Sequence, residues 1–332
     1  MPPARPAAPT SAFTDVALEA GLDAALERLP AAPGVGQILG EEGRSLLIGR
    51  SADLRRWLAT NLGRAAVKKG QRPPTDLTPI ARTVRFIAAT SGFHQRLTFE
   101  RLMARYVAPS ARRDLKIPGY LHLDASERFP RLVAQAGGGG RADVLGPFRD
   151  RAAAGRAREA LHKLYALRPC DYRFEPHPEL PLGVACLFAQ VRTCAAPCLA
   201  RVSEEAYRAL AHEALAFLAE PARRPDPPAW LPPFVTAASA RGLVAERGEA
   251  GLELYPVVAG CVRDAAAQVV PHDALAQGLA GLEWDVPPVP GADEAWLTSW
   301  LYERKRTGRF VPVPHEAEPS ALRAAIRAAL EP

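Results

Sequence analysis

Residues 167–198 read LRPCDYRFEPHPELPLGVACLFAQVRTCAAPC, and the cysteines in this stretch constrain the surrounding fold more than any other feature. The four are Cys170, Cys186, Cys194 and Cys198, in the spacing C-x15-C-x7-C-x3-C. Thiols gathered this closely can reach one metal centre, because thiolate is the ligand that zinc and iron–sulfur clusters prefer. Unrelated buried thiols are the alternative. Disulfides are disfavoured, because the sequence shows no secretory signal and reads as an intracellular type.

Each cysteine lies in a short motif. Residues 167–170 read LRPC, residues 185–187 read ACL and residues 192–198 read RTCAAPC, while FPRL at 129–132 and GPF at 146–148 precede them. In this order the motifs resemble the central segment of UvrC, the nicking subunit of bacterial nucleotide excision repair, where an LRxC, a PCL and an RCxAPC follow one another. The resemblance implies that the cysteines ligate a [4Fe–4S] cluster. Zinc is the competing metal. The ligands would be Cys170, Cys186, Cys194 and Cys198.

Two further motifs lie upstream. Residues 29–36 read LPAAPGVG and residues 45–50 read SLLIGR, which resemble the opening LPxxPGVY and the YVGK strand of the GIY-YIG nuclease domain of that family. Leu46 to Ile48 is a short apolar run that ends at a glycine, as a buried strand does. We therefore expect two strands, joined across a turn at 41–44, and a helix over residues 53–63.

The catalytic residues of that nuclease domain are only partly retained. The resemblance puts Gly36 and Leu47 where the family has its two tyrosines, and neither side chain can take or donate a proton. Trp57 stands at the arginine position, beside Arg55 and Arg56, and Arg112 stands where an asparagine closes the domain. Loss of catalysis is the favoured interpretation.

Two residues of the catalytic set survive. Arg50 replaces the lysine and would bind the phosphate, and Glu100 matches the glutamate that binds Mg²⁺ or Mn²⁺. For Glu100 a metal ligand and an ordinary solvated helix residue both remain open, since a lone carboxylate holds a divalent ion poorly. Whether the chain is an enzyme, a GIY-YIG-type DNA endonuclease, is therefore open at this stage.

The charge distribution indicates a nucleic-acid partner. The net charge of the 332 residues is +6, and residues 44–72 contain eight basic residues but one acid. Such a surface collects phosphates by releasing condensed counterions. An arginine-rich composition is the alternative, yet residues 246–294 are acidic, and this asymmetry favours a DNA-binding face. The DNA-binding candidates are Arg50, Arg55, Arg56, Arg64, Lys68 and Lys69.

Breaks in the pattern predict an α+β chain with four parts. Residues 1–26 are expected to form a disordered tail and a lead-in helix, the helix over 11–29. Residues 27–112 form the small GIY-YIG-like α/β domain, residues 113–220 the helical four-cysteine region, and residues 221–332 a linker at 221–233 followed by a separate C-terminal α+β domain of unknown role.

Further elements follow from the same pattern. Strands are expected at 83–89 (or a buried helix there), 120–123, 131–134, 243–246 and 252–258, and helices at 95–106, 150–166, 203–218, 296–302 and 320–330. In the helix over 296–302, Trp296 and Trp300 are expected in the core rather than stacked on bases. Ser203 is the expected N-cap of the helix that follows the last cysteine.

Two classes of function follow. The first is a UvrC-like DNA-repair endonuclease; the second is a non-catalytic iron–sulfur protein that binds DNA or serves as a scaffold in repair. A zinc-stabilised nucleic-acid module is a weaker third. No apolar run reaches the roughly 18 residues of a membrane span, so a cytoplasmic location is expected. After residue 218 nothing resembles the hairpin with which UvrC docks on UvrB, so other repair partners are not predicted.

Overall fold

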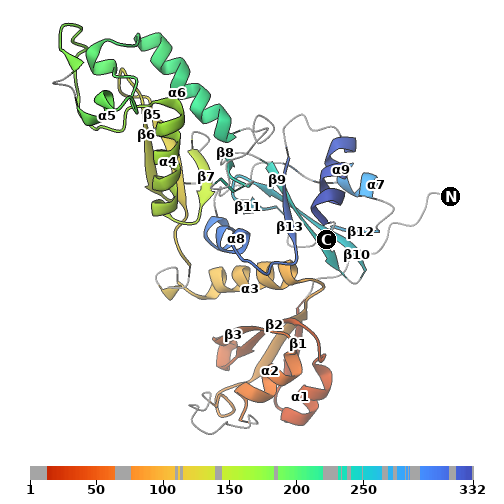
Figure 1. Cartoon of the computed structure of the whole chain (residues 1–332). Coiled ribbons are helices and arrows are strands. Elements are labelled where there is room, and N and C mark those ends of the chain that lie inside the picture. Colours follow the sequence, from red (N-terminus) through yellow and green to blue (C-terminus); the bar gives the residue numbers. More distant parts are fainter. Residues whose placement is uncertain are drawn as a thin grey trace.

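The computed structural model has a mixed α+β architecture in which small antiparallel sheets are flanked by helices (Figure 1), which confirms the predicted fold class. It describes residues 13–63, 76–108, 111–112, 115–138, 144–182, 186–219, 231–232, 234–237, 241–248, 250–263, 268–271, 275–280, 282, 284, 292–313 and 319–330. Arg64, Lys68 and Lys69, the predicted tail at 1–12 and most of the predicted linker lie outside these residues.

The first sheet has the strand order β1-β4-β2-β3 and contains the predicted hairpin. The hairpin strands pair because Val35 and Ile38 are fully buried on β2, and a short 3-10 turn joins them. Asp53 caps the following helix by accepting a hydrogen bond from the Arg56 N–H at 2.9 Å, as the expected helix over 53–63 requires. The elements are β1 (Thr14–Ala17), α1 (Leu22–Arg28), β2 (Gly34–Leu39), β3 (Ser45–Ser51), α2 (Leu54–Asn61) and β4 (Thr83–Ala88).

The lead-in segment is not one helix, so the prediction of a helix over 11–29 is wrong for its first half. Thr14 to Ala17 form β1, which pairs antiparallel with β4, and the helix begins only at Leu22. Val16 is buried opposite Val84, and Arg85 binds Asp15 on the same pair of strands. This pairing joins residues about 70 positions apart, which a local periodicity does not report.

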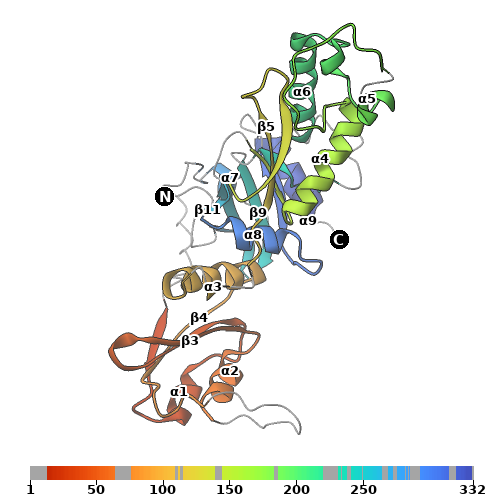
Figure 2. The ribbon, with the colours of Figure 1, turned by 90° about the vertical axis from the view of Figure 1, so that its left-hand side faces the viewer.

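A single long helix, α3 (Gly92–Tyr106), connects the first sheet with the rest of the molecule (Figures 1 and 2). It is the predicted helix over 95–106, extended by one turn at its start, where Ser91 accepts a hydrogen bond from the His94 N–H. Phe99 and Leu102 pack on the first sheet, whereas Phe93 and Leu97 belong to the core on the other side. The helix is therefore covered on two faces.

The second sheet has the order β6-β5-β7-β8 and carries the cysteine region. The predicted hairpin of β5 and β6 is present, and Ser203 caps α6 by accepting from the Ala206 N–H at 3.1 Å, as predicted. The elements are β5 (Gly119–Asp124), β6 (Arg131–Ala136), β7 (Val144–Phe148), α4 (Arg151–Tyr165), α5 (Leu187–Gln190), a 3-10 turn (Pro197–Leu199), α6 (Glu204–Ala219) and β8 (Thr236–Ala237).

The third sheet is built on the long hairpin of β9 and β10, which the sequence also predicts. Val244 and Tyr255 face α8, whereas Leu243 and Leu254 face α7 and α9, so the helices cover opposite sides of the sheet. The elements are β9 (Arg241–Gly248), β10 (Gly251–Val258), β11 (Cys261–Val262), β12 (Gln268–Val270), α7 (Leu275–Ala280), α8 (Glu294–Leu301), β13 (Arg309–Val313) and α9 (Pro319–Leu330).

One hydrophobic core joins α3, the second sheet and the third sheet. Phe93 contacts the rings of Tyr255 and Trp300 with centroid separations of 4.7 Å each. Trp296 and Trp300 are both buried, which confirms that they are core residues. Leu231 and Phe234, at the end of the predicted linker and just beyond it, are also buried in this core. Within the described residues, no helix is long and apolar enough to cross a membrane.

Candidate nucleic-acid and metal sites

The Trp57 side chain covers part of the first sheet. Gly36 on β2 lies opposite Gly49 on β3, and the indole of Trp57 lies across both. A Cβ atom added at Gly36 would overlap the six-membered ring, and one added at Gly49 would overlap Nε1. Leu47, at the second tyrosine position, packs in the same cluster as Trp57. An apolar indole therefore covers the place to which a side chain at position 36 would point.

Glu100 is buried, with 1% of its surface exposed, and it binds two arginines. Arg96 Nε lies 2.7 Å from Oε1, and Arg112 donates to Oε2. Its description as a solvated helix residue is therefore wrong. Both carboxylate oxygens are engaged by cations, and a divalent ion would have to displace a guanidinium to reach either of them.

Glu100 and Arg50 lie on different faces of α3. Glu100 follows Phe93 by seven residues and Leu97 by three, so it shares the face that turns away from the first sheet. Arg50 instead lies over the ring of Phe99, at 5.7 Å from its centroid, on the face that packs on that sheet. Glu100 and the ring that Arg50 covers therefore lie on different faces of α3.

The basic candidates on α2 differ in how far their side chains are engaged. Arg55 donates from Nε and Nη2 to the Leu29 carbonyl at 3.1 and 3.0 Å, which caps the end of α1. Arg56 is exposed, and it is its backbone N–H that donates to Asp53. Arg50 is also exposed. All three described candidates are therefore exposed, and the Arg55 guanidinium is in addition held by the Leu29 carbonyl.

The four cysteines are neighbours in the structure. All are free thiols, so the disulfide alternative is not realised. Burial, together with the smaller effects of the charges of Cys170, Cys186 and Cys198, raises the pKa of Cys194 to about 11. Burial and the neighbouring Cys186 and Cys170 also raise the pKa of Cys198. Thiols that influence one another in this way lie within electrostatic reach.

The donor set fits a thiolate-bound metal in its chemistry. A cation would stabilise the thiolate forms that burial and mutual repulsion disfavour, which is the coupling that metal sites use. In the part of the chain that the structure describes, no three His, Cys, Asp or Glu side chains are gathered closely enough to hold a metal ion. The Ala196 N–H already donates to the Cys194 sulfur at 3.4 Å, the kind of contact that tunes a ligand.

Comparison with known proteins places this region in a family. Residues 119–217 match the profile of the UvrC/Cho excinuclease middle domain. UvrABC system protein C of Rhodospirillum rubrum is 32% identical over 201 residues, which are 59% of this chain and 30% of that protein. The same protein of Geobacter metallireducens is 31% identical over 210 residues, 58% of this chain and 31% of that protein. Over about 58% of its length the chain is distantly homologous to UvrC.

The homology covers only part of the length of the UvrC proteins that the chain matches. UvrABC system protein C of Hyphomonas neptunium is 29% identical over 202 residues, so the chain again spans only about 31% of a curated UvrC. No solved structure matches the chain. The profile match covers β5, β6, β7 and the four cysteines, and the resemblance of residues 27–112 to a GIY-YIG nuclease remains a prediction.

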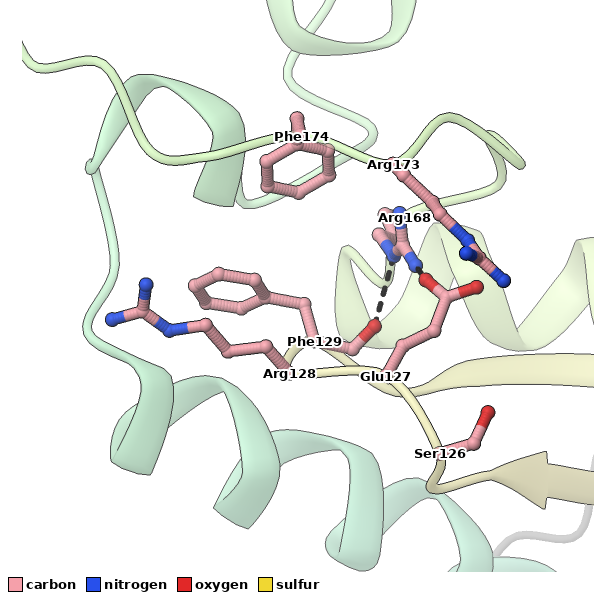
Figure 3. A pocket seen from close by; sticks show the side chains of 7 residues that line it. All are labelled: Ser126, Glu127, Arg128, Phe129, Arg168, Arg173 and Phe174. Carbon is pink, nitrogen blue, oxygen red and sulfur yellow. Dashed lines mark hydrogen bonds and ion pairs between the residues drawn. The ribbon is translucent and has the colours of Figure 1, made fainter.

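Within the UvrC-like region, Arg168 of the LRPC motif is a scaffold residue (Figure 3). Only 2% of it is exposed, and its guanidinium donates to the Phe129 and Tyr172 carbonyls at 2.9 and 2.8 Å and pairs with Glu127. Its backbone N–H donates to the hydroxyl of Tyr207 at 2.8 Å. Arg168 therefore ties the chain just before Cys170 to the β5–β6 turn and to α6.

The pocket beside Arg168 has a volume of about 370 Å³. The rings of Phe129 and Phe174 stack in it at 5.6 Å, and Arg128 on its rim binds Glu204 at 2.6 Å. Because Arg128 and Arg168 of the lining pair with carboxylates, the pocket supports the cysteine segment. The UvrC motif indicates Arg168, but most of its partners come from the β5–β6 turn and from α6, about 40 residues away on either side, where no local pattern reports them.

Proposed function

We propose that this UvrC-related chain acts in a DNA-repair context as a DNA-binding protein whose nuclease-like unit no longer cuts. The observation that carries the proposal is the Trp57 indole lying on Gly36 and Gly49, where a GIY-YIG nuclease has its first tyrosine. Glu100, the carboxylate of the catalytic set, is held by two arginines and would have to leave them to bind a metal ion that activates water.

DNA binding is supported by the exposed cations of the first sheet and α2. Arg50 and Arg56 are exposed, and the acid nearest to them in sequence, Asp53, is used as a helix cap. Phosphate contacts of this kind release counterions, so affinity should fall with salt, with a slope of about 0.9 per contact. Arg64, Lys68 and Lys69 belong to the same basic stretch, outside the described residues.

We further propose that Cys170, Cys186, Cys194 and Cys198 bind a [4Fe–4S] cluster, with Zn²⁺ as the alternative. The proposal is supported by the electrostatic influence of the thiols on one another and by their place in the region that matches the UvrC/Cho middle domain. A bound cluster would crosslink the segments after α4 and before α6. The hydrogen bonds of Arg168 to the Phe129 and Tyr172 carbonyls position the segment that follows α4.

Metal analysis tests the cluster. Protein purified without oxygen should contain about four iron and four sulfide per chain, and Cys194→Ser should lose most of both. Cys261→Ser is the matched control, because Cys261 is buried in the third sheet and accepts from the Ala292 N–H at 3.1 Å. Zinc without sulfide would favour the zinc alternative. Protein that contains neither iron nor zinc would refute both the cluster and the zinc site.

A combined gel assay tests the DNA function. Wild-type protein is incubated with nicked, lesion-bearing and branched DNA in Mg²⁺ or Mn²⁺, and both bound and cut DNA are scored. We expect binding that weakens with salt and in Arg50→Ala/Arg56→Ala, and no cutting. Cutting that survives purification to constant specific activity and disappears in Arg50→Ala would show a rebuilt active site and overturn the non-catalytic proposal.

A further inference from the structure

The loop between α8 and β13 is the most basic short segment of the C-terminal part. Residues 302–309 read YERKRTGR, with four cations and one acid. The acid, Glu303, pairs with Arg96 of α3 at 3.4 Å. Thr307 of the same loop donates to Glu246 on β9. The loop is therefore tied at two points, and its single carboxylate is directed to α3.

This loop forms one wall of a pocket of about 490 Å³. Phe234 and Tyr302 contribute aromatic surface to the lining, with ring centroids 5.0 Å apart and planes at 88°. The charged lining is dominated by arginine, since Glu303 is its one acid. The arginines are Arg304, Arg306 and Arg309.

Within the described residues the positive charge of the pocket is offset only in part, by Glu303. Burial, followed by the charge of Arg309, lowers the pKa of Arg306, so the two guanidinium groups repel each other. Arg306 Nη1 donates to the Leu301 carbonyl, but Nε is buried with no acceptor in the described part of the chain. Arg309 Nη1 reaches only loop carbonyls, at 3.2 and 3.5 Å.

Arg306 is nevertheless fixed in position. Its guanidinium carbon lies 5.6 Å from the Trp300 ring and 6.0 Å from the Phe234 ring, a cation–π arrangement. A buried donor without a partner costs free energy, and so does the repulsion between two cations. An anion with several acceptor oxygens would relieve both. Guanidinium forks match phosphate oxygens in particular.

We propose that this pocket binds a backbone phosphate of DNA, as a second contact point outside the UvrC-like region. The inference rests on the proposed DNA binding and extends it to residues 302–309. The loop is attached to α3 through Arg96, and α3 also carries Phe99, on which Arg50 lies. A DNA strand that contacted both Arg50 and residues 302–309 would run along α3.

The test is the salt dependence of DNA affinity, measured by fluorescence anisotropy with a labelled duplex and a labelled single strand. Arg304→Ala/Arg309→Ala should lower the slope of log K against log salt by about 0.9 for each phosphate that the variant no longer binds. If both arginines bind phosphate, the wild-type affinity should fall about tenfold more than that of the variant between 50 and 200 mM salt. Arg304 is exposed, so Arg304→Glu alone serves as a second variant.

Arg327→Ala is the matched control, because Arg327 is exposed on α9, on the opposite side of the third sheet. It removes one charge and should leave the slope unchanged. DNA binding with unaltered slopes in both loop variants would refute the second contact point and leave the proposed function intact. Absence of DNA binding by the wild type would refute both. An equal change of slope in the Arg327 variant would show a general charge effect and also overturn the site.

Discussion

The size of the residue at position 36 determines which side chain can pack beside it. Gly36 leaves room for an indole, and Trp57 fills that room from α2. The two residues are therefore coupled: a larger residue at 36 requires a smaller one at 57. The predicted resemblance to a GIY-YIG nuclease would put a tyrosine and an arginine at these two positions.

Gly36→Ala should lower the free energy of unfolding of the first unit by about 1–3 kcal/mol, because the new methyl group overlaps the Trp57 ring. Adding Trp57→Leu should recover part of the loss, so the double variant would be more stable than the sum of the two single effects. The measurement is a double-mutant cycle from urea unfolding. Strict additivity would mean that the indole does not lie on Gly36.

Glu100 is the second residue whose role depends on the residues around it. Glu100→Gln should destabilise the protein by about 3–5 kcal/mol, because it removes the carboxylate that Arg112 binds and leaves the buried Arg96 with only Glu303, at 3.4 Å. Thermal unfolding measures the loss. Arg82→Gln, which breaks an exposed pair with Glu41, is the control and should cost less than about 1 kcal/mol.

This prediction also bears on catalysis. If Glu100 bound a catalytic metal instead, Glu100→Gln would leave stability nearly unchanged without metal and would abolish stabilisation by Mn²⁺. Inactivity of a Glu100 variant is informative only when the variant is folded, since loss of the ion pairs alone would remove any activity.

At the scale of elements, α4 carries a pH-sensitive contact. Burial, and then the charge of Arg158, lowers the pKa of His162 from its ordinary 6.5 to about 4. The unfolded chain therefore binds a proton between pH 6.5 and 4 that the folded chain does not. The stability from this site is complete above pH 6.5 and falls as the pH drops toward 4, by about 3 kcal/mol in total.

His162→Leu should flatten the pH dependence of stability between pH 6.5 and 4, because no proton is then taken up on unfolding at this position. The measurement is urea unfolding across that range, compared with wild type. His212→Leu, at an exposed position of α6, is the control and should keep the wild-type slope. A slope in His162→Leu equal to that of wild type would contradict the assignment.

At the scale of the whole molecule, the C-terminal part is needed by the UvrC-like part. Phe93 of α3, Tyr207 of α6 and Trp300 of α8 belong to one hydrophobic core, and β8 completes the sheet that begins with β5. A chain ending at residue 219 would expose this core. We expect it to associate or aggregate, because exposed apolar patches of this kind are not tolerated on a monomer.

Size-exclusion chromatography and thermal unfolding of residues 1–219 beside the full chain check this expectation. The full chain should lose the second and third sheets in a single transition, because they share their core. A monomeric fragment with its own cooperative transition would show instead that residues 113–219 fold independently.

The sequence by itself determined the elements whose signals are local. The β2–β3 hairpin, the helix that became α3, the Ser203 cap and the cysteine spacing each depend on residues within about one helix or hairpin of one another. The motifs around the cysteines also indicated the relation to UvrC. The identity of a bound metal and DNA binding stay predictions.

Features that depend on contacts between residues far apart in the chain are seen only in the folded structure. β1 forms because Thr14–Ala17 pair with a strand about 70 residues away, Glu100 is neutralised by Arg112 from beyond the helix, and Trp57 covers Gly36 from another element. The pocket at 302–309 likewise needs Phe234 from the end of the linker. Periodicity and spacing report neighbours along the chain, whereas burial and charge pairing are set by neighbours in space.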